Sequence, residues 1–170
     1  ALGGAVSLDA VNPWHFRRQL APVLAARLEG RRIRKGPVLA WLRRLRRRCD
    51  FLVVEGAGGL LSPLGEGWST RDLVAGLRAV PVVVCPNRLG AVNQVRLVLA
   101  ALPRGAARRA VVVLNATGTS DASAPANGKL LEEWRGKGGV CRFPRLGEAA
   151  SVEGVRRQAE LVRAWRGCLG

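Results

Sequence analysis

Four short apolar runs, rich in valine, constrain the fold of this chain more than any other feature. They are residues 50–54 (DFLVV), 81–85 (PVVVC), 110–114 (AVVVL) and, more weakly, 139–143 (GVCRF). None alternates between polar and apolar residues as a strand with one solvated face would, and helical stretches separate them. The pattern predicts an open, mainly parallel α/β sheet with helices on both faces.

Helices are expected between and around these strands. The first is predicted from Phe16 to Leu28, ending at Gly30, and the second opens at Pro37 and runs to about Arg48. The others are predicted at about 70–78, 90–102, 126–136 and 152–166. Because no repeat or low-complexity linker divides the sequence, we expect residues 1–170 to form one domain.

Composition narrows the class of protein. A chain of 170 residues with 48% hydrophobic residues is long enough to bury a core. It has no apolar run of about 18 residues, and its first residues lack the basic flank and apolar core of a signal peptide, so we expect a cytoplasmic protein without a membrane part. The four cysteines are far apart and there is one histidine, which indicates neither a zinc site nor a disulfide framework.

The formal net charge of +16 raises the question of a nucleic-acid partner. Nearly all of this charge is arginine, as GC-rich coding would give, and the densest cluster falls within the helix predicted at 37–48. The apolar residues of that segment keep helical spacing, which is typical of a helix with one solvated face. We favour the solvated face over a nucleic-acid patch, because charge alone identifies no partner.

In an open α/β sheet, ligands bind beyond the carboxyl ends of the strands. The four predicted strand exits are residues 55–59 (EGAGG), 86–93 (PNRLGAVN), 115–118 (NATG) and 144–146 (PRL). A carboxylate can hold Mg²⁺, glycines let a backbone approach a phosphate, and an asparagine amide can pair with a purine edge. Taken one at a time, the acid and the asparagine are better explained by turn formation, and the glycines can serve merely to make a turn.

Four segments together resemble the dethiobiotin synthetases. They are residues 11–33, 50–64, 69–94 and 110–117, and the VEGAGG sequence followed by PL is the most specific part. The resemblance implies a P-loop-type α/β fold and a homodimer. It also implies an enzyme that uses ATP, Mg²⁺ and CO₂ to close a ureido ring on 7,8-diaminononanoate.

The resemblance assigns roles to residues at the strand exits. Glu55 corresponds to the acid that binds the metal ion. The residues that correspond to the nucleotide site are Glu55, Gly56, Ala57, Gly58, Asn115, Pro144, Arg145 and Leu146. The residues that correspond to the substrate site, including a helix start that receives the substrate carboxylate across the dimer, are Gly58, Gly59, Leu89, Gly90 and Asn93. A helix N-terminus offers free N–H groups and a positive dipole end to such a carboxylate.

One departure from the family pattern is large. The phosphate-binding motif GxxxxGK[ST] does not occur in these residues, and the family's lysines lie upstream of the region where the resemblance begins. We therefore assign no catalytic residue within this chain, and we expect an N-terminally truncated sequence that is inactive alone. The alternatives are a P-loop-less relative that only binds or dimerises, with its arginine-rich face on an anionic partner, and another amide-forming enzyme of the same superfamily.

Overall fold

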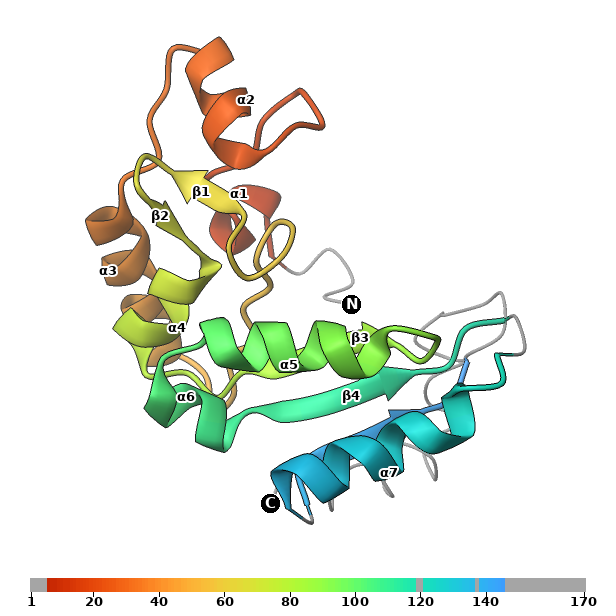
Figure 1. Cartoon of the computed structure of the whole chain (residues 1–170). Helices are drawn as coiled ribbons and strands as arrows, with labels where there is room; N and C mark the ends of the chain where they lie inside the picture. The colour runs from red at the N-terminus through yellow and green to blue at the C-terminus, as the bar shows by residue number, and fades with distance from the viewer. Residues whose placement is uncertain (1–5, 119–120, 137, 146–170) are drawn as a thin grey trace. The chain divides into compact units, whose positions relative to one another are not determined.

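The computed structural model describes residues 6–118, 121–136 and 138–145 (Figure 1). Contacts within the chain group into two compact units, residues 1–79 (unit 1) and residues 80–170 (unit 2). Each unit is described by itself. The prediction of a single domain remains a prediction.

Unit 2 contains the parallel sheet. Its strands are β3 (Val82–Pro86), β4 (Val111–Asn115) and β5 (Val140–Phe143), in the order β3-β4-β5. Both pairs are parallel, with Val84 opposite Val113 and Val113 opposite Cys141. The strands predicted at 81–85, 110–114 and 139–143 are confirmed, each displaced by about one residue. The α/β class with a parallel sheet is confirmed as well.

The central strand β4 carries the core of unit 2. The side chains from Val111 to Leu114 are all buried, since β4 has a strand on each side. Helices α5 (Ala91–Ala101) and α7 (Ala124–Arg135) contact β3, β5 and each other, and they lie along the same side of the sheet in Figure 1. Helix α6 (Arg104–Arg109) is a short helix that the sequence analysis did not predict.

Unit 1 is mainly helical. Its elements are α1 (Leu8–Val11), α2 (Pro22–Leu28), α3 (Lys35–Arg46), the antiparallel strands β1 (Pro63–Gly65) and β2 (Trp68–Ser69), and α4 (Thr70–Leu77). The Trp68 indole N–H donates to the Ile33 carbonyl at 3.0 Å, which fastens the small hairpin to the core. The buried residues of that core are Ala26, Ile33, Val38, Leu42, Leu64, Trp68 and Leu73.

The helix predicted over 16–28 is too long at its start. Helix α2 begins at Pro22, where the fixed φ of proline suits a first helical position and its missing N–H costs nothing. The preceding segment is held in an irregular path by Arg31, whose guanidinium donates to the Pro13 and His15 carbonyls and lies over the Phe16 ring. The helices predicted at 37–48, 70–78, 90–102 and 126–136 are confirmed within about two residues at each end. The helix predicted at 152–166 lies outside the described residues.

The strand predicted at 50–54 is wrong. Residues 51–54 have no regular structure, and the side chains of Phe51 and Val53 are 79% and 77% exposed. A single extended segment is not stable without a hydrogen-bonded neighbour. Among the described residues, no strand pairs with residues 50–54. The apolar sequence alone therefore does not make it a strand here.

Candidate functional site

The first group of candidate residues is the loop Glu55–Gly59 in unit 1. Gly58 has φ +82°, a left-handed conformation that favours glycine, and the Gly59 N–H donates to the Ser62 hydroxyl at 2.8 Å. A Cβ at Gly56 would overlap the Thr70 hydroxyl, so Gly56 lies directly on the first residue of α4. The packing of the loop on its own unit thus requires glycine at both positions.

The carboxylate of Glu55 is available to a ligand. It is exposed, and it makes no hydrogen bond or ion pair with any described residue. The Thr70 hydroxyl oxygen, which Gly56 covers, is buried and has no partner in the described part of the chain. Carboxylate and hydroxyl oxygens are hard donors of the kind that Mg²⁺ prefers, and Mg²⁺ in nucleotide sites is usually bound by one or two protein groups plus phosphates.

This loop therefore fits a magnesium ion brought in with a nucleotide, and not a self-sufficient metal centre. No group of three histidine, cysteine, aspartate or glutamate side chains is placed to hold a metal ion within residues 6–118, 121–136 and 138–145. Glu55 would supply one ligand, and phosphate and water oxygens would supply the rest.

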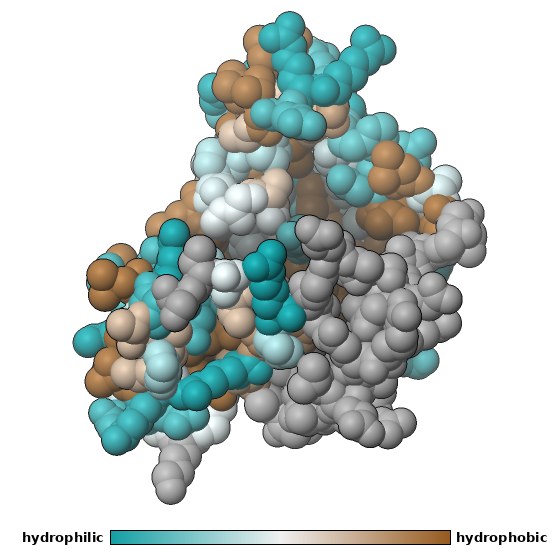
Figure 2. Space-filling view, turned by 90° about the vertical axis from the view of Figure 1, so that its right-hand side faces the viewer, coloured by the Kyte–Doolittle hydropathy of each residue, from teal (hydrophilic) through white to brown (hydrophobic). Residues whose placement is uncertain are grey.

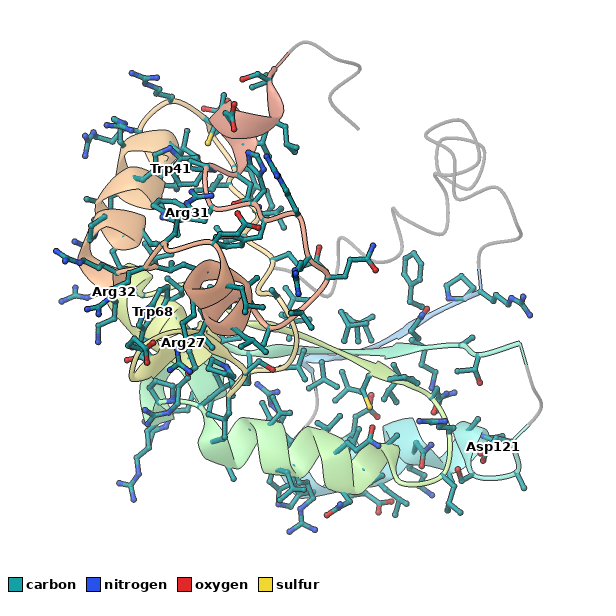
Figure 3. All side chains as sticks on the ribbon, turned by 90° about the horizontal axis from the view of Figure 1, so that it is seen from above. Arg27, Arg31, Arg32, Trp41, Trp68 and Asp121 are labelled. Atoms are coloured by element: carbon teal, nitrogen blue, oxygen red, sulfur yellow. The ribbon has the colours of Figure 1, made fainter. Side chains whose placement is uncertain are left out.

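The second group lies where β3 leads into α5, in unit 2. Gly90, with φ +91°, is the N-cap of α5 and has no side-chain cap. The preceding N–H, of Leu89, donates to the Asp121 carboxylate at 2.8 Å. Asp121, labelled in Figure 3, lies in the loop before α7, next to this turn. A carboxylate of the chain itself thus occupies one amide of the turn that the resemblance assigns to the substrate carboxylate.

Asp121 is held as an anion by its surroundings. Hydrogen bonds from the Ser123 hydroxyl, and then from the backbone N–H groups of Leu89 and Ser123, hold the pKa of the Asp121 carboxyl below its ordinary value. The sequence analysis missed Asp121. The available signal was aspartate two residues before serine, which is typical of a turn closed by the aspartate side chain.

The third group lies at the ends of β4 and β5, also in unit 2. The Asn115 side chain is exposed and has no partner among the described residues, while its carbonyl accepts from the Asn87 N–H at 2.8 Å. The following N–H, of Ala116, donates to the Phe143 carbonyl at 2.8 Å. The Asn115 side chain is therefore free to bind a ligand, while hydrogen bonds to both neighbouring segments fix its backbone.

The structure brings Arg145 to the same place. The Arg145 guanidinium packs over Gly118 so closely that a Cβ on Gly118 would overlap it. Pro144 and Arg145 follow directly after β5, and Asn115 ends β4, so three of the predicted nucleotide residues lie at adjacent strand ends. Leu146 lies outside the described residues. Asn93 is exposed in the first turn of α5.

A pair of asparagines, of which Asn127 is buried and Asn87 half-buried, supports the second and third groups. The Asn127 side chain, 4% exposed, donates to the Asn87 side-chain oxygen at 2.9 Å and to the Arg88 carbonyl at 3.1 Å. The Asn87 amide in turn donates to the Ala124 carbonyl at 3.1 Å. The sequence analysis missed Asn127, since one asparagine in the first turn of a helix carries no distinctive signal.

The arginine-rich helix α3 has the buried stripe that its sequence predicts. Val38 and Leu42 are buried, while Arg43 donates to the Gly76 carbonyl and Arg46 to the Cys49 carbonyl. In the described part of the face that Figure 2 shows, hydrophilic and hydrophobic residues are interspersed. The interpretation of this charge as a solvated helix face, and not as a nucleic-acid patch, remains a prediction.

The groove found in unit 1 does not include the candidate residues. It has a volume of about 560 Å³, and the rings of Trp14 and Trp41 meet in it edge to face. Its lining residues are Pro13, Trp14, Pro37, Ala40, Trp41, Arg44 and Arg47. The predicted nucleotide residues thus do not line this groove. The meeting of Glu55 with Asn115 in one site stays a prediction, because these residues belong to different units.

A parallel α/β sheet with candidate ligand groups at its strand exits is typical of nucleotide-binding proteins. The model of the AAA domain family, a class of P-loop nucleotide-hydrolysing proteins, matches residues 5–156. Within this class, the chain belongs to the ATP-dependent dethiobiotin synthetase family.

Relatives of that name support this assignment. The chain is 37% identical over 151 residues to the protein of Anaeromyxobacter sp. strain Fw109-5, and the aligned region covers 88% of this chain and 68% of the relative. It is 43% identical over 121 residues to the protein of Anaeromyxobacter dehalogenans, covering 71% and 54% of the two chains. It is 27% identical over 158 residues to the protein of Bacillus subtilis, covering 92% and 66%. The chain thus spans about half to two-thirds of these relatives.

No described helix is both long and apolar enough to span a membrane.

Proposed function

We propose that this protein acts in biotin biosynthesis as an ATP- and Mg²⁺-dependent dethiobiotin synthetase, as a homodimer in the cytoplasm. The substrates would be 7,8-diaminononanoate, CO₂ and ATP. One amine takes up CO₂ as a carbamate, the γ-phosphate of ATP transfers to the carbamate oxygen, and the second amine displaces phosphate to close the ureido ring. The observation that carries the proposal is the 151-residue match to a relative of that name.

The residues of this chain would contribute binding and orientation. Glu55 would hold the Mg²⁺ ion, which when bound neutralises charge that develops on the transferring phosphoryl group. The free Asn115 amide has one acceptor oxygen and a donor NH₂, which suits the edge of adenine. The N-terminal turn of α5 would receive the substrate carboxylate with its remaining N–H groups, in competition with Asp121 at Leu89.

The catalytic lysines and the phosphate loop of the family have no counterpart in these 170 residues. Phosphoryl transfer relies on such groups for most of its electrostatic stabilisation. We therefore propose that this stretch supplies the metal-binding acid and the base and carboxylate sites. The groups that act on the phosphates themselves would come from outside it.

A second candidate function is a binding or dimerising role without catalysis. The observation that favours it is the absence of GxxxxGK[ST], together with the exposed arginines Arg44 and Arg47, which have no ion-pair partner in the described residues. Binding to duplex DNA with a steep dependence on log salt would support this role. Binding too weak to detect at about 50 mM salt would count against it.

The experiment that tests the main proposal uses the Glu55→Gln variant of the full-length protein. Incorporation of labelled bicarbonate into dethiobiotin is measured with saturating ATP, Mg²⁺ and diamine. Because one metal ligand is lost at the site of charge development, we expect turnover to fall by about 100-fold or more.

The matched control is Glu132→Gln, which removes an exposed carboxylate without a side-chain partner among the described residues, and should leave turnover unchanged. Turnover of Glu55→Gln close to that of the control would remove Glu55 from the mechanism. The absence of any labelled dethiobiotin with the unmodified protein would overturn the proposed function itself.

A further inference from the structure

The asparagine pair Asn87–Asn127 joins elements that are far apart in the sequence. Asn127 is the fourth residue of α7, and Asn87 is the first residue after β3. Asn127 is also the one buried polar or charged side chain of the described residues. Its NH₂ group has the Asn87 oxygen and the Arg88 carbonyl as acceptors at 2.9 and 3.1 Å, with the Ser123 hydroxyl at 3.4 Å.

The connections of this pair lead to both candidate groups of unit 2. The Asn87 N–H donates to the Asn115 carbonyl, and the Arg88 carbonyl held by Asn127 also accepts from the Ala91 N–H at the start of α5. One buried amide therefore restrains the exit of β3, the end of β4 and the first turn of α5. A buried amide that loses its partner costs about 1–3 kcal/mol. Such a cost is enough to keep these loops in one arrangement.

We infer that Asn127 is a positioning residue for nucleotide recognition. It contacts no ligand itself. Through Asn87 it fixes the backbone of Asn115, the residue whose free side-chain amide would recognise the base. This inference rests on the proposed function, in which Asn115 recognises adenine.

The test is the Asn127→Asp variant of the full-length protein, which keeps the shape of the side chain but removes both donors. At pH 8 the introduced carboxylate would face the Asn87 and Arg88 oxygens, and the loop would lose its arrangement. We expect the Kd for Mg-ATP, measured by calorimetry, to rise at least about tenfold. The Kd for inorganic tripolyphosphate with Mg²⁺, which has no base, should stay unchanged.

Acid should partly reverse the defect. Burial between two oxygen acceptors raises the pKa of the introduced carboxyl well above that of an exposed aspartate. Near pH 5.5 its protonated form has an O–H to donate to the Asn87 oxygen. The ratio of the two Kd values should then move back toward that of the unmodified protein measured at the same pH. A residue that matters only for packing would not give this dependence.

Two further variants make the result decisive. Asn12→Asp adds the same charge at an exposed site and keeps the oxygen that accepts from the Trp14 N–H, so neither Kd should change. Asn87→Ala removes the half-buried partner and should reproduce the selective loss for ATP even if Asn127→Asp does not fold.

Three outcomes overturn the inference. The first is an equal loss of affinity for ATP and for tripolyphosphate in the folded variants, which would show a general structural role. The second is no loss of affinity for either ligand, which would show that Asn127 has no role. The third outcome is an unmodified protein that binds tripolyphosphate and has no preference for ATP over GTP. Asn115 would then not recognise the base, and the inference would fail with it. If dethiobiotin is formed in the assay above, the proposed function survives all three.

Discussion

The glycine loop of unit 1 and the strand exits of unit 2 hold their candidate ligand groups in different ways. Glu55–Gly59 follows a segment without a strand, and side-chain hydroxyls of Ser62 and Thr70 pack against its glycines. In unit 2, the Asn115 backbone is held by hydrogen bonds from the neighbouring strands and by the pair Asn87–Asn127. An apolar run therefore becomes a defined edge of a site only where a neighbouring strand pairs with it.

The largest difference between the two regions is expected when apolar side chains are removed from each. Leu114 in β4 is 1% exposed, so Leu114→Ala leaves a cavity and should lower the free energy of unfolding by about 2–5 kcal/mol. Val53 is 77% exposed, and Val53→Ala should change it by less than about 0.5 kcal/mol. Urea denaturation followed by circular dichroism gives both values. A comparable loss at Val53 would mean that residues 51–54 are packed as a buried strand.

The sequence predicts much of unit 2 because its signals are local and agree with the tertiary structure. The runs PVVVC and AVVVL become β3 and β4, since each has a ladder partner in the same unit. The run DFLVV is similarly apolar but has no partner strand in the described residues, and its apolar character cannot reveal that difference. Pro22 shows the same limit at a helix start, because the apolar periodicity upstream of it is outweighed by the path that Arg31 imposes.

The candidate site is predictable only in part for a related reason. Glu55, Asn115 and Arg145 were identified from their places after apolar runs and from the family resemblance. Asp121 and Asn127 were missed because their importance comes from contacts with Leu89 and Asn87, more than 30 residues away in the sequence. Such contacts depend on the fold and leave no pattern within a short window.

A smaller loss of stability is expected when a side chain is added at a glycine of the loop Glu55–Gly59. Gly58→Ala forces a side chain into a left-handed φ of +82° and places its Cβ against the Ser62 hydroxyl. Gly30→Ala has a similar φ of +66° but open space around the Cβ. We expect a loss of about 1 kcal/mol for Gly30→Ala and of about 2–3 kcal/mol for Gly58→Ala, from thermal unfolding. Equal losses would mean that Ser62 does not hold the loop.

The smallest effect is expected in the pH dependence of stability, to which one carboxylate from each region contributes. Asp121 in unit 2 and Asp72 in unit 1 both have a carboxyl pKa below the ordinary value. The causes are chiefly the Ser123 hydroxyl for Asp121 and the Ser69 backbone N–H for Asp72. A depressed pKa in the folded state stabilises the protein above the unfolded pKa, and this contribution is lost as the pH falls through the folded value.

The Asn variants should therefore be less stable than the unmodified protein near neutral pH, and the difference should shrink in acid. Asp121→Asn and Asp72→Asn should each flatten the decline in melting temperature below about pH 4, because an amide cannot take up the proton that the carboxylate binds on unfolding. The change should be larger for Asp72, which also pairs with Lys35 at 3.2 Å, than for Asp121, which has no ion-pair partner among the described residues. The reverse order would mean that the hydrogen bonds to Asp121 stabilise its anion more than the Ser69 N–H and Lys35 stabilise that of Asp72.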